Sequence, residues 1–266
     1  MTIGELWRYD GRRAVVTGCA SGIGAQVARQ VRELGGTVIG LDLAEPAAEL
    51  DGFHRVDMAD PASIDAAVAE LGPVDTLFNV AGVSSGIGDP PKVVTINFLG
   101  LRHLTEALLP GLRQGATIAS VSSLAAANWL EHRDQTTGLL DTDGFEAGRA
   151  WCAANPEALE DGGYRLSKEA IIHYTARAAA PLGARGIRVN CTGPGVTETP
   201  ILDQLRTAYG DQYLDTIPKP LDGRVSDPAE QAAVLVFLNS AAASYVTGQV
   251  IWVDGGNVAG RLAGPV

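Results

Sequence analysis

The sequence predicts an α/β protein with a doubly wound parallel sheet that has helices on both faces. Short apolar runs rich in Val and Ile recur along the chain and are not polar at alternate positions, as expected for strands buried on both faces. Helical segments separate these runs, and such alternation implies parallel strands with right-handed crossovers. The predicted strands cover residues 14–17, 37–41, 74–80, 116–121, 187–191 and 250–253.

The predicted helices follow from apolar stripes and start signals. Residues 22–34 place four apolar side chains at helical spacing, and Asp60 followed by Pro61 is an N-cap with proline at the first helical position. That second helix is expected to run through residue 69. The chain shows no internal repeat, low-complexity segment or linker, so we expect one domain over residues 1–266. Further helices are predicted over residues 91–112, 163–182 and 228–239.

Composition excludes several classes of protein. The 266 residues include 20 basic and 31 acidic side chains, a net charge of −11 that argues against a nucleic-acid partner. Three widely spaced cysteines form no CxxC pair and indicate reduced thiols rather than disulfides or a zinc site. No apolar run is long enough to span a membrane, and the first ten residues lack a signal-peptide core. We therefore expect a cytoplasmic protein without a membrane partner.

One stretch, residues 127–163, interrupts the alternation. It contains eight acidic residues against two basic ones, a net charge of −6, and includes Trp129 and Trp151. Unstructured loops of this length are uncommon in compact domains and are usually functional or locally helical. Asn155-Pro156 is typical of the N-cap and first turn of a short helix.

A glycine-rich turn follows the first strand and opens the first helix. Residues 17–24 read TGCASGIG, and glycines there allow a tight turn and close approach of backbone to a pyrophosphate. The following helix N-terminus presents free N–H groups and its positive dipole end to phosphates. The alternative is a tight turn between strand and helix that binds no ligand. The expected contacts come from Gly18, Ser21, Gly22, Ile23 and Gly24.

Asp42 ends the second strand, 24 residues after Gly18. A carboxylate at this place can accept hydrogen bonds from both adenosine ribose hydroxyls and repels a 2′-phosphate. Leu43 offers no cation for such a phosphate, so the sequence favours NAD over NADP as cofactor. The alternative is a solvated loop acid.

Tyr164 and Lys168 are four residues apart, which places them on one helix face. An unperturbed phenol is a poor base at neutral pH, and a nearby ammonium favours the phenolate. Tyr164 can then pass a proton to or from a carbonyl or alcohol oxygen as a general acid or base. Ser122-Ser123 follows the strand predicted over residues 116–121, where a hydroxyl can hold the substrate oxygen beside the tyrosine. No histidine lies in a motif that suggests a hydrolase base or a metal site, so no metal is expected.

These motifs together resemble the classical short-chain dehydrogenase/reductase family, from about residue 11 to residue 256. The resemblance implies a single-domain Rossmann fold with about seven strands and assigns Ser123, rather than Ser122, to catalysis. It adds Asn97 to a catalytic tetrad with Ser123, Tyr164 and Lys168. It also implies cofactor contacts beyond those of the turn and Asp42, from Asp57, Met58, Asn79, Ala81, Gly82, Tyr164, Lys168, Thr197 and Thr199.

The serine–tyrosine separation of 41 residues departs from the usual pattern and resembles one branch of the family. That branch contains bacterial 3α-hydroxysteroid dehydrogenase/carbonyl reductase and coniferyl-alcohol dehydrogenases. Because the insertion leaves beside Ser123 and returns beside Tyr164, it must border the site, and we expect residues 127–163 to act as a substrate lid. Its aromatic side chains either wall an apolar pocket or form a small core of their own. The expected substrate contacts are Trp129, Trp151, Leu202 and Leu205.

The functional hypothesis is therefore an NAD(H)-dependent oxidoreductase that interconverts a hydrophobic alcohol, steroid-like or aromatic and allylic, with its carbonyl. The alternative is a regulatory protein of the same fold that senses NAD(H) without turnover. Relatives often pair through the helices that contain Asn97 and Tyr164. A bulky acidic insertion beside them predicts a homodimer, with a tetramer as the alternative.

Overall fold

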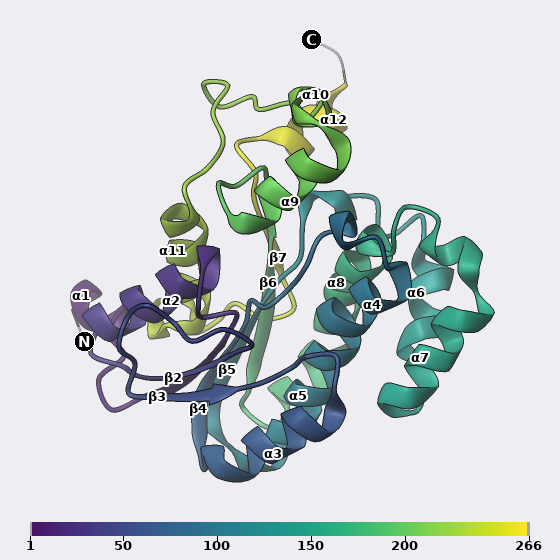
Figure 1. Cartoon of the computed structure of the whole chain (residues 1–266). Helices are drawn as coiled ribbons and strands as arrows, with labels where there is room; N and C mark the ends of the chain where they lie inside the picture. The colour runs from purple at the N-terminus through teal and green to yellow at the C-terminus, as the bar shows by residue number, and fades with distance from the viewer. Residues whose placement is uncertain (1, 265–266) are drawn as a thin grey trace.

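A single parallel sheet of seven strands organises the chain in the computed structural model, which describes residues 2–264 (Figure 1). Neighbouring strands pair in the order β3-β2-β1-β4-β5-β6-β7, and every pair is parallel. The predicted doubly wound α/β fold is confirmed. The strands are β1 Arg13–Thr17, β2 Thr37–Asp42, β3 Gly52–Arg55, β4 Val74–Asn79, β5 Leu112–Val121, β6 Arg188–Pro194 and β7 Val250–Val253.

Strand β3 is absent from the strands predicted by apolar runs. It is four residues long and contains His54 and Arg55, and all four of its residues are partly or fully exposed. It lies at the edge of the sheet and pairs with β2, so that Asp42 is opposite Arg55. An edge strand needs no run of buried side chains, which explains why periodicity did not reveal it.

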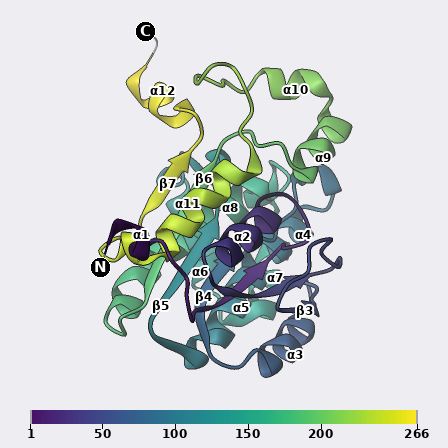
Figure 2. The same ribbon diagram turned by 90° about the vertical axis from the view of Figure 1, so that its left-hand side faces the viewer.

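Helices α2, Gly22–Glu33, and α11, Pro228–Asn239, lie side by side on one face of the sheet (Figure 2). Val27 and Val31 of α2 and Leu235 of α11 share a buried core with β1. Asp227 caps α11 by accepting a hydrogen bond from the Ala229 N–H, in a capping box with Glu230. This layer supports the turn between β1 and α2.

The opposite face is covered by α3, Pro61–Leu71, a helical stretch that starts at Pro90, and α8, Tyr164–Gly183. The Asp60 carboxylate accepts a hydrogen bond from the Ala62 N–H, and Pro61 is the first helical residue, as predicted. The helix predicted over residues 91–112 ends too late, because Pro110 and Gly111 terminate it and Leu112 already belongs to β5.

That stretch is also not uniform along its length. It consists of α4 Pro90–Val94, a π-helical segment Thr95–Gly100, α5 Leu101–Leu108 and a 3₁₀ turn Leu109–Gly111. The π segment contains Asn97, and such segments are frequent at functional sites.

The insertion is helical rather than an open loop. After a 3₁₀ turn, Leu124–Ala126, it forms α6 Arg133–Leu140, α7 Gly144–Ala154 and a 3₁₀ turn Pro156–Leu159. Figure 1 shows α6 and α7 outside α4 and α8, away from the sheet. The Asn155 side chain does not cap the last turn as expected, because its amide donates to the Trp151 carbonyl oxygen instead.

Two helices lie above the carboxyl ends of the strands, at the top of Figure 1. They are α9, Pro200–Tyr209, and α10, Asp211–Asp215, and they follow β6. The remaining short segments are α1 Ile3–Leu6, α12 Asn257–Ala263 and the 3₁₀ turns Ser85–Ile87 and Ala241–Ala243.

None of the helices within residues 2–264 has the length and apolar character needed to cross a bilayer.

Candidate active site

A cavity of about 400 Å³ lies at the carboxyl ends of the central strands. Its wall is formed by the segments that follow β1 to β6, by the first turns of α8 and by residues of α9 and α10. Crevices outside the carboxyl ends of the strands are the usual ligand sites of open α/β sheets. The predicted site residues that line it are Gly18, Ser21, Gly22, Ile23, Gly24, Asp42, Asp57, Met58, Ala81, Gly82, Ser123, Tyr164, Lys168, Thr197, Thr199, Leu202 and Leu205.

The glycine-rich turn has no room for side chains at two of its glycines. Gly18 has a positive φ of 69°, and a Cβ there would lie 2.8 Å from the Ala81 Cα. A Cβ at Gly24 would lie 2.0 Å from the Gly18 carbonyl oxygen. Ser21 caps α2 without a side-chain hydrogen bond, so the first N–H groups of the helix remain available beside the cavity. The turn has the geometry that a phosphate group requires.

Asp42 braces this turn and lines the cavity. Its Oδ2 accepts a hydrogen bond from the Ala20 N–H at 2.9 Å, and its Oδ1 accepts one from the Ala44 N–H at 3.0 Å. Asp42 is therefore not a freely solvated loop acid. Arg55, which sequence reasoning missed, is its partner on β3, and the Arg55 guanidinium donates to the Leu43 carbonyl. A cation therefore lies near Asp42. The sequence did not predict this neighbour, because the strand β3 that carries Arg55 has no apolar run.

Asp57, Met58, Ala81 and Gly82 line the cavity farther along, but Asn79 does not. The Asn79 side chain is buried and donates to Thr105 Oγ1 at 3.0 Å and to Ser120 Oγ at 3.4 Å. It joins β4 to α5 and β5. The structure thus places Asn79 in the support of the sheet and not in contact with the cavity.

The two serines after β5 have different surroundings. Ser122 Oγ donates to the Lys168 carbonyl oxygen at 2.7 Å and is buried. The Ser123 hydroxyl accepts a hydrogen bond from the Ala125 N–H at 3.2 Å, and both Ser123 and Tyr164 line the cavity. Ser123 is therefore the serine whose hydroxyl lowers the pKa of the Tyr164 phenol, and its catalytic role stays a prediction.

Tyr164 and Lys168 lie one turn apart on α8 and both face the cavity. The Lys168 Nζ is 5.7 Å from the centroid of the Tyr164 ring. Burial lowers the pKa of Lys168 to about 8. Burial also raises the pKa of Tyr164, whereas the hydrogen bond with Ser123 lowers it. The expected shift of the tyrosine toward phenolate is therefore not present here, because desolvation outweighs the other effects.

Asn97 is buried behind the cavity rather than in its wall. Its Oδ1 accepts a hydrogen bond from the Val83 N–H at 2.8 Å, while its Nδ2 donates to the Val83 carbonyl at 3.0 Å and to Ser167 Oγ at 3.1 Å. A Cβ at Gly82 would lie 3.1 Å from Asn97 Oδ1 and 3.5 Å from Lys168 Nζ. Asn97 thus links the loop after β4 to α8, close to Lys168.

Thr197 and Thr199 belong to the loop between β6 and α9. Thr197 Oγ1 donates to the Gly195 carbonyl at 3.0 Å and contacts Ser226 Oγ at the same distance. Beyond them, residues 200–217, which include α9 and α10 and are called the lid below, contribute mostly apolar side chains to the cavity. They are Ile201, Leu202, Leu205, Leu214 and Ile217, together with the polar Gln204 and Tyr213 that sequence reasoning did not assign.

Trp129 and Trp151, predicted as substrate contacts, are not among the described residues that line the cavity. They pack against the core formed by the insertion and α8. The Trp129 ring lies 5.6 Å from the ring of His173, and Trp151 packs against Gly138 of α6. Neither alternative that the sequence left open describes the structure fully, because the insertion packs into a core that it shares with α8 and with the segment that contains Asn97.

The four histidines form their polar contacts away from the cavity, with Glu70, Asp65, Glu169 and Thr136. Within residues 2–264, no group of three or more His, Cys, Asp or Glu side chains is arranged to hold a metal ion. The described cavity brings together the Ser123 hydroxyl, the Tyr164 phenol and the Lys168 ammonium. The glycine-rich turn lines the same cavity. A parallel sheet with this arrangement defines an oxidoreductase of the dinucleotide-binding class.

Comparison with known proteins agrees with this class. Residues 12–133 match the family model described as short chain dehydrogenase, and residues 153–257 match one described as Enoyl-(Acyl carrier protein) reductase. Coniferyl-alcohol dehydrogenase of Pseudomonas sp. (strain HR199 / DSM 7063) is 38% identical, over 92% of this chain and 96% of its own. The 3-alpha-hydroxysteroid dehydrogenase/carbonyl reductase of Comamonas testosteroni is 34% identical, over 91% and 95%. The chain belongs to the short-chain dehydrogenase/reductase family.

A solved structure shows the same architecture. The 3-alpha-hydroxysteroid dehydrogenase from Pseudomonas sp. B-0831, in complex with NADH, aligns with a TM-score of 0.81 at 30% identity and covers 96% of this chain and 100% of its own. The fold predicted from the sequence is thus shared over nearly the whole length.

Proposed function

We propose that this protein is an NAD(H)-dependent dehydrogenase/reductase that interconverts a hydrophobic secondary or aromatic-allylic alcohol with its carbonyl. One observation carries the proposal. A single cavity contains the glycine-rich turn and Asp42 in one part and Ser123, Tyr164 and Lys168 under an apolar lid in another.

The residues present fit NAD(H). The clash of a Cβ at Gly18 and Gly24 indicates a turn that accepts only backbone close to the ligand, as a pyrophosphate needs. Asp42 is placed to accept hydrogen bonds from ribose hydroxyls and to repel a 2′-phosphate. Arg55 opposes that preference, but its guanidinium donates to the Leu43 carbonyl. The related structure from Pseudomonas sp. B-0831 holds NADH.

When bound, NAD supplies the hydride acceptor, and NADH the donor. The chain positions the substrate and moves the proton. Ser123 orients the substrate oxygen by a hydrogen bond, and Tyr164, which lines the same cavity, takes the proton from an alcohol or gives it to a carbonyl. The Lys168 ammonium stabilises the phenolate when it forms. Asn97 holds the Val83 backbone and Ser167 beside Lys168.

The proposed substrate class rests on the lid. Ile201, Leu202, Leu205 and Leu214 face the same cavity as Tyr164. Pockets with an apolar lining and a few placed polar groups suit hydrophobic ligands better than sugars or acyl phosphates. The names of the relatives, a coniferyl-alcohol and a 3-alpha-hydroxysteroid dehydrogenase, are consistent with this class.

A protein that only senses NAD(H) is the weaker candidate. Such a protein needs the cofactor cradle but has no need of a serine, a tyrosine and a lysine gathered where a substrate would react. All three line the cavity here, and Asn97 lies behind them.

The test is a screen of NAD reduction, followed by NADH absorbance, with steroid, coniferyl-type and aliphatic alcohols. We expect turnover with at least one of the first two classes and weak turnover with the third. Tight NAD(H) binding without turnover of any alcohol, or of the matching carbonyls with NADH, would refute the proposed activity in favour of a sensor.

A further inference from the structure

Tyr164 is the first residue of α8, where a helix is most prone to fray. The chain reaches it through Gly162 and Gly163, both with a positive φ, and Gly163 as the N-cap has no side chain to accept a hydrogen bond from the first turn. A side-chain cap is the usual means of holding such a turn. The position of the proposed acid/base residue must therefore be secured in another way.

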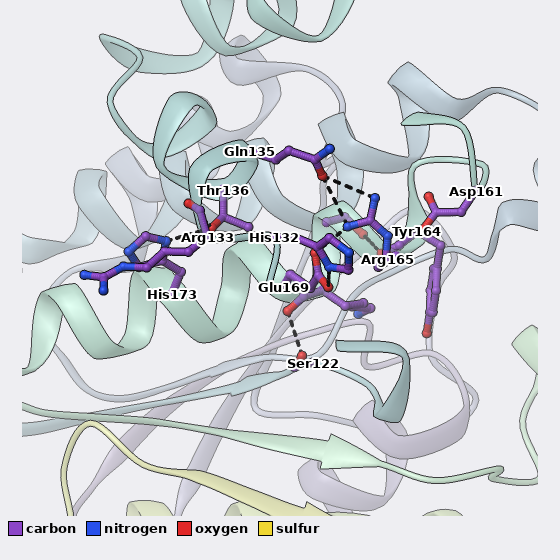
Figure 3. A network of polar contacts seen from close by, with 12 residues as sticks. Ser122, His132, Arg133, Gln135, Thr136, Asp161, Tyr164, Arg165, Glu169 and His173 are labelled. Atoms are coloured by element: carbon purple, nitrogen blue, oxygen red, sulfur yellow. Dashed lines mark hydrogen bonds and ion pairs between the residues drawn. The ribbon is translucent and has the colours of Figure 1, made fainter. Parts of the chain in front are cut away.

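A cluster of charges secures it from the side of the insertion. Arg165, the residue after Tyr164, forms an ion pair with Asp161 at 2.7 Å through Nε and one with Glu169 at 2.7 Å. Its guanidinium also donates to Gln135 Oε1 at 3.3 Å. Figure 3 shows Gln135 and Asp161 of the insertion around Arg165, with Tyr164 beside them.

Glu169 is the centre of the cluster. Its side chain is fully buried and follows Lys168 in the sequence. One carboxylate oxygen accepts from Arg165, and the other accepts from His132 Nδ1 at 2.7 Å. Both oxygens of this buried side chain therefore have a hydrogen-bond partner, as buried polar groups require. The pairs therefore connect both ends of the insertion, His132 and Asp161, to the first turns of α8.

We propose that Glu169 and Arg165 are positioning residues that hold Tyr164 and Lys168 in register with Ser123. The inference rests on the proposed function, because it names what holds the acid/base residue of that reaction. It also gives the insertion a role other than contact with the substrate, since Trp129 and Trp151 do not line the cavity.

The chain offers a matched control. Arg177, toward the other end of α8, forms an ion pair of 2.7 Å with Asp141 of the insertion, and both side chains are about half exposed. Arg177→Gln removes an ion pair of the same length between the same two parts of the molecule, but far along the helix from Tyr164. Glu169→Gln removes the buried charge and keeps the shape of the side chain.

Two measurements test the proposal on the full-length protein. In Glu169→Gln, misplacement of Tyr164 should lower kcat by between about tenfold and a hundredfold. The dissociation constant of NADH, measured by fluorescence, should change far less than kcat, because the glycine-rich turn and Asp42 lie outside the cluster. Amide hydrogen exchange in the peptide that contains Ser167, whose N–H donates to the Gly163 carbonyl, should be about tenfold faster. Arg177→Gln should change none of these.

An unchanged kcat in Glu169→Gln, or an equal loss in Arg177→Gln, would overturn the proposal. If Glu169→Gln does not fold, His132→Gln removes one bond to the carboxylate and leaves the Arg165 pair. That variant should show the same changes to a smaller degree, and wild-type values in it would then refute the role. The exchange measurement needs no substrate. A wild-type protein without turnover would therefore refute the proposed function, while hydrogen exchange would still test whether the cluster around Glu169 holds the first turn of α8.

Discussion

The ammonium group of Lys168 donates a hydrogen bond of 3.0 Å to the Val121 carbonyl oxygen at the end of β5. Lys168 is only 3% exposed, and no carboxylate among the described side chains forms an ion pair with it. One neutral hydrogen bond does not offset the loss of water around a charge, which is why burial lowers its pKa to about 8. A lysine kept in such surroundings weakens the fold and is explained by the chemistry of the site.

The first prediction follows from this cost. Lys168→Met should abolish turnover but raise the free energy of unfolding near neutral pH by up to about 3 kcal/mol, the equivalent of a pKa lowered from 10.5 to about 8. Chemical denaturation of both proteins measures this. A variant less stable than the wild type would contradict the prediction.

The lowered pKa of Lys168 also determines how the free energy of unfolding changes with pH. Between about pH 8 and pH 10.5 the unfolded chain binds more protons at Lys168 than the folded one, so wild-type stability should rise with pH across this window relative to Lys168→Met. Below that window both states are protonated, and the difference between the two proteins should be constant.

The second prediction concerns the phenol. Tyr164→Phe removes the proton donor while leaving the ring, so kcat should fall by between about a hundredfold and ten-thousandfold. NADH binding should be retained. Tyr174→Phe is the matched control, because Tyr174 lies on the same helix but packs against Phe98, with ring centroids 6.2 Å apart, outside the cavity. Substantial residual activity in Tyr164→Phe would refute the assigned role.

The third prediction concerns Asp42 and Arg55. Asp42→Ala removes the carboxylate and leaves the Arg55 guanidinium beside the place expected for the adenosine ribose. The preference of kcat/KM for NAD over NADP should fall by about tenfold to a hundredfold. Replacing Arg55 by Ala as well should remove the gained use of NADP. Equal use of both cofactors by the wild type would contradict the role of Asp42.

The fourth prediction separates the lid from the insertion. Leu202 is buried in the cavity wall, so Leu202→Ala should raise KM for a hydrophobic alcohol by about tenfold with little change in NADH binding. Trp129→Phe should lower thermal stability and leave KM unchanged, because Trp129 packs against His173 outside the cavity. A substrate-dependent change of KM in Trp129→Phe would restore the substrate role first expected for the insertion.

The fifth prediction is the state of association. Helices α6 and α7 pack on α8 and on the segment that contains Asn97, the surfaces through which relatives were expected to pair. We therefore expect a homodimer in light scattering, formed away from these helices. A tetramer whose contacts involve the helices of Asn97 and Tyr164 would contradict this.

The amino-acid sequence by itself determined the alternation of strands and helices, the glycine-rich turn and the pairing of Tyr164 with Lys168. These features depend on local spacing: buried parallel strands need apolar runs, a tight turn needs glycine, and four residues make one helical turn. They were predictable because each signal lies within a short stretch of chain.

Tertiary structure alone decided which side chains meet across the chain. It placed Trp129 and Trp151 against a core shared with α8, and Asn79 in hydrogen bonds with α5 and β5. It also placed Arg55 beside Asp42, and Glu169 between His132 and Arg165. An edge strand with exposed residues has no apolar run, and no local spacing relates His132 to Glu169. Arg165 and Glu169 lie one turn apart on α8, but the other partners come from separate elements, so packing and not local spacing selects them.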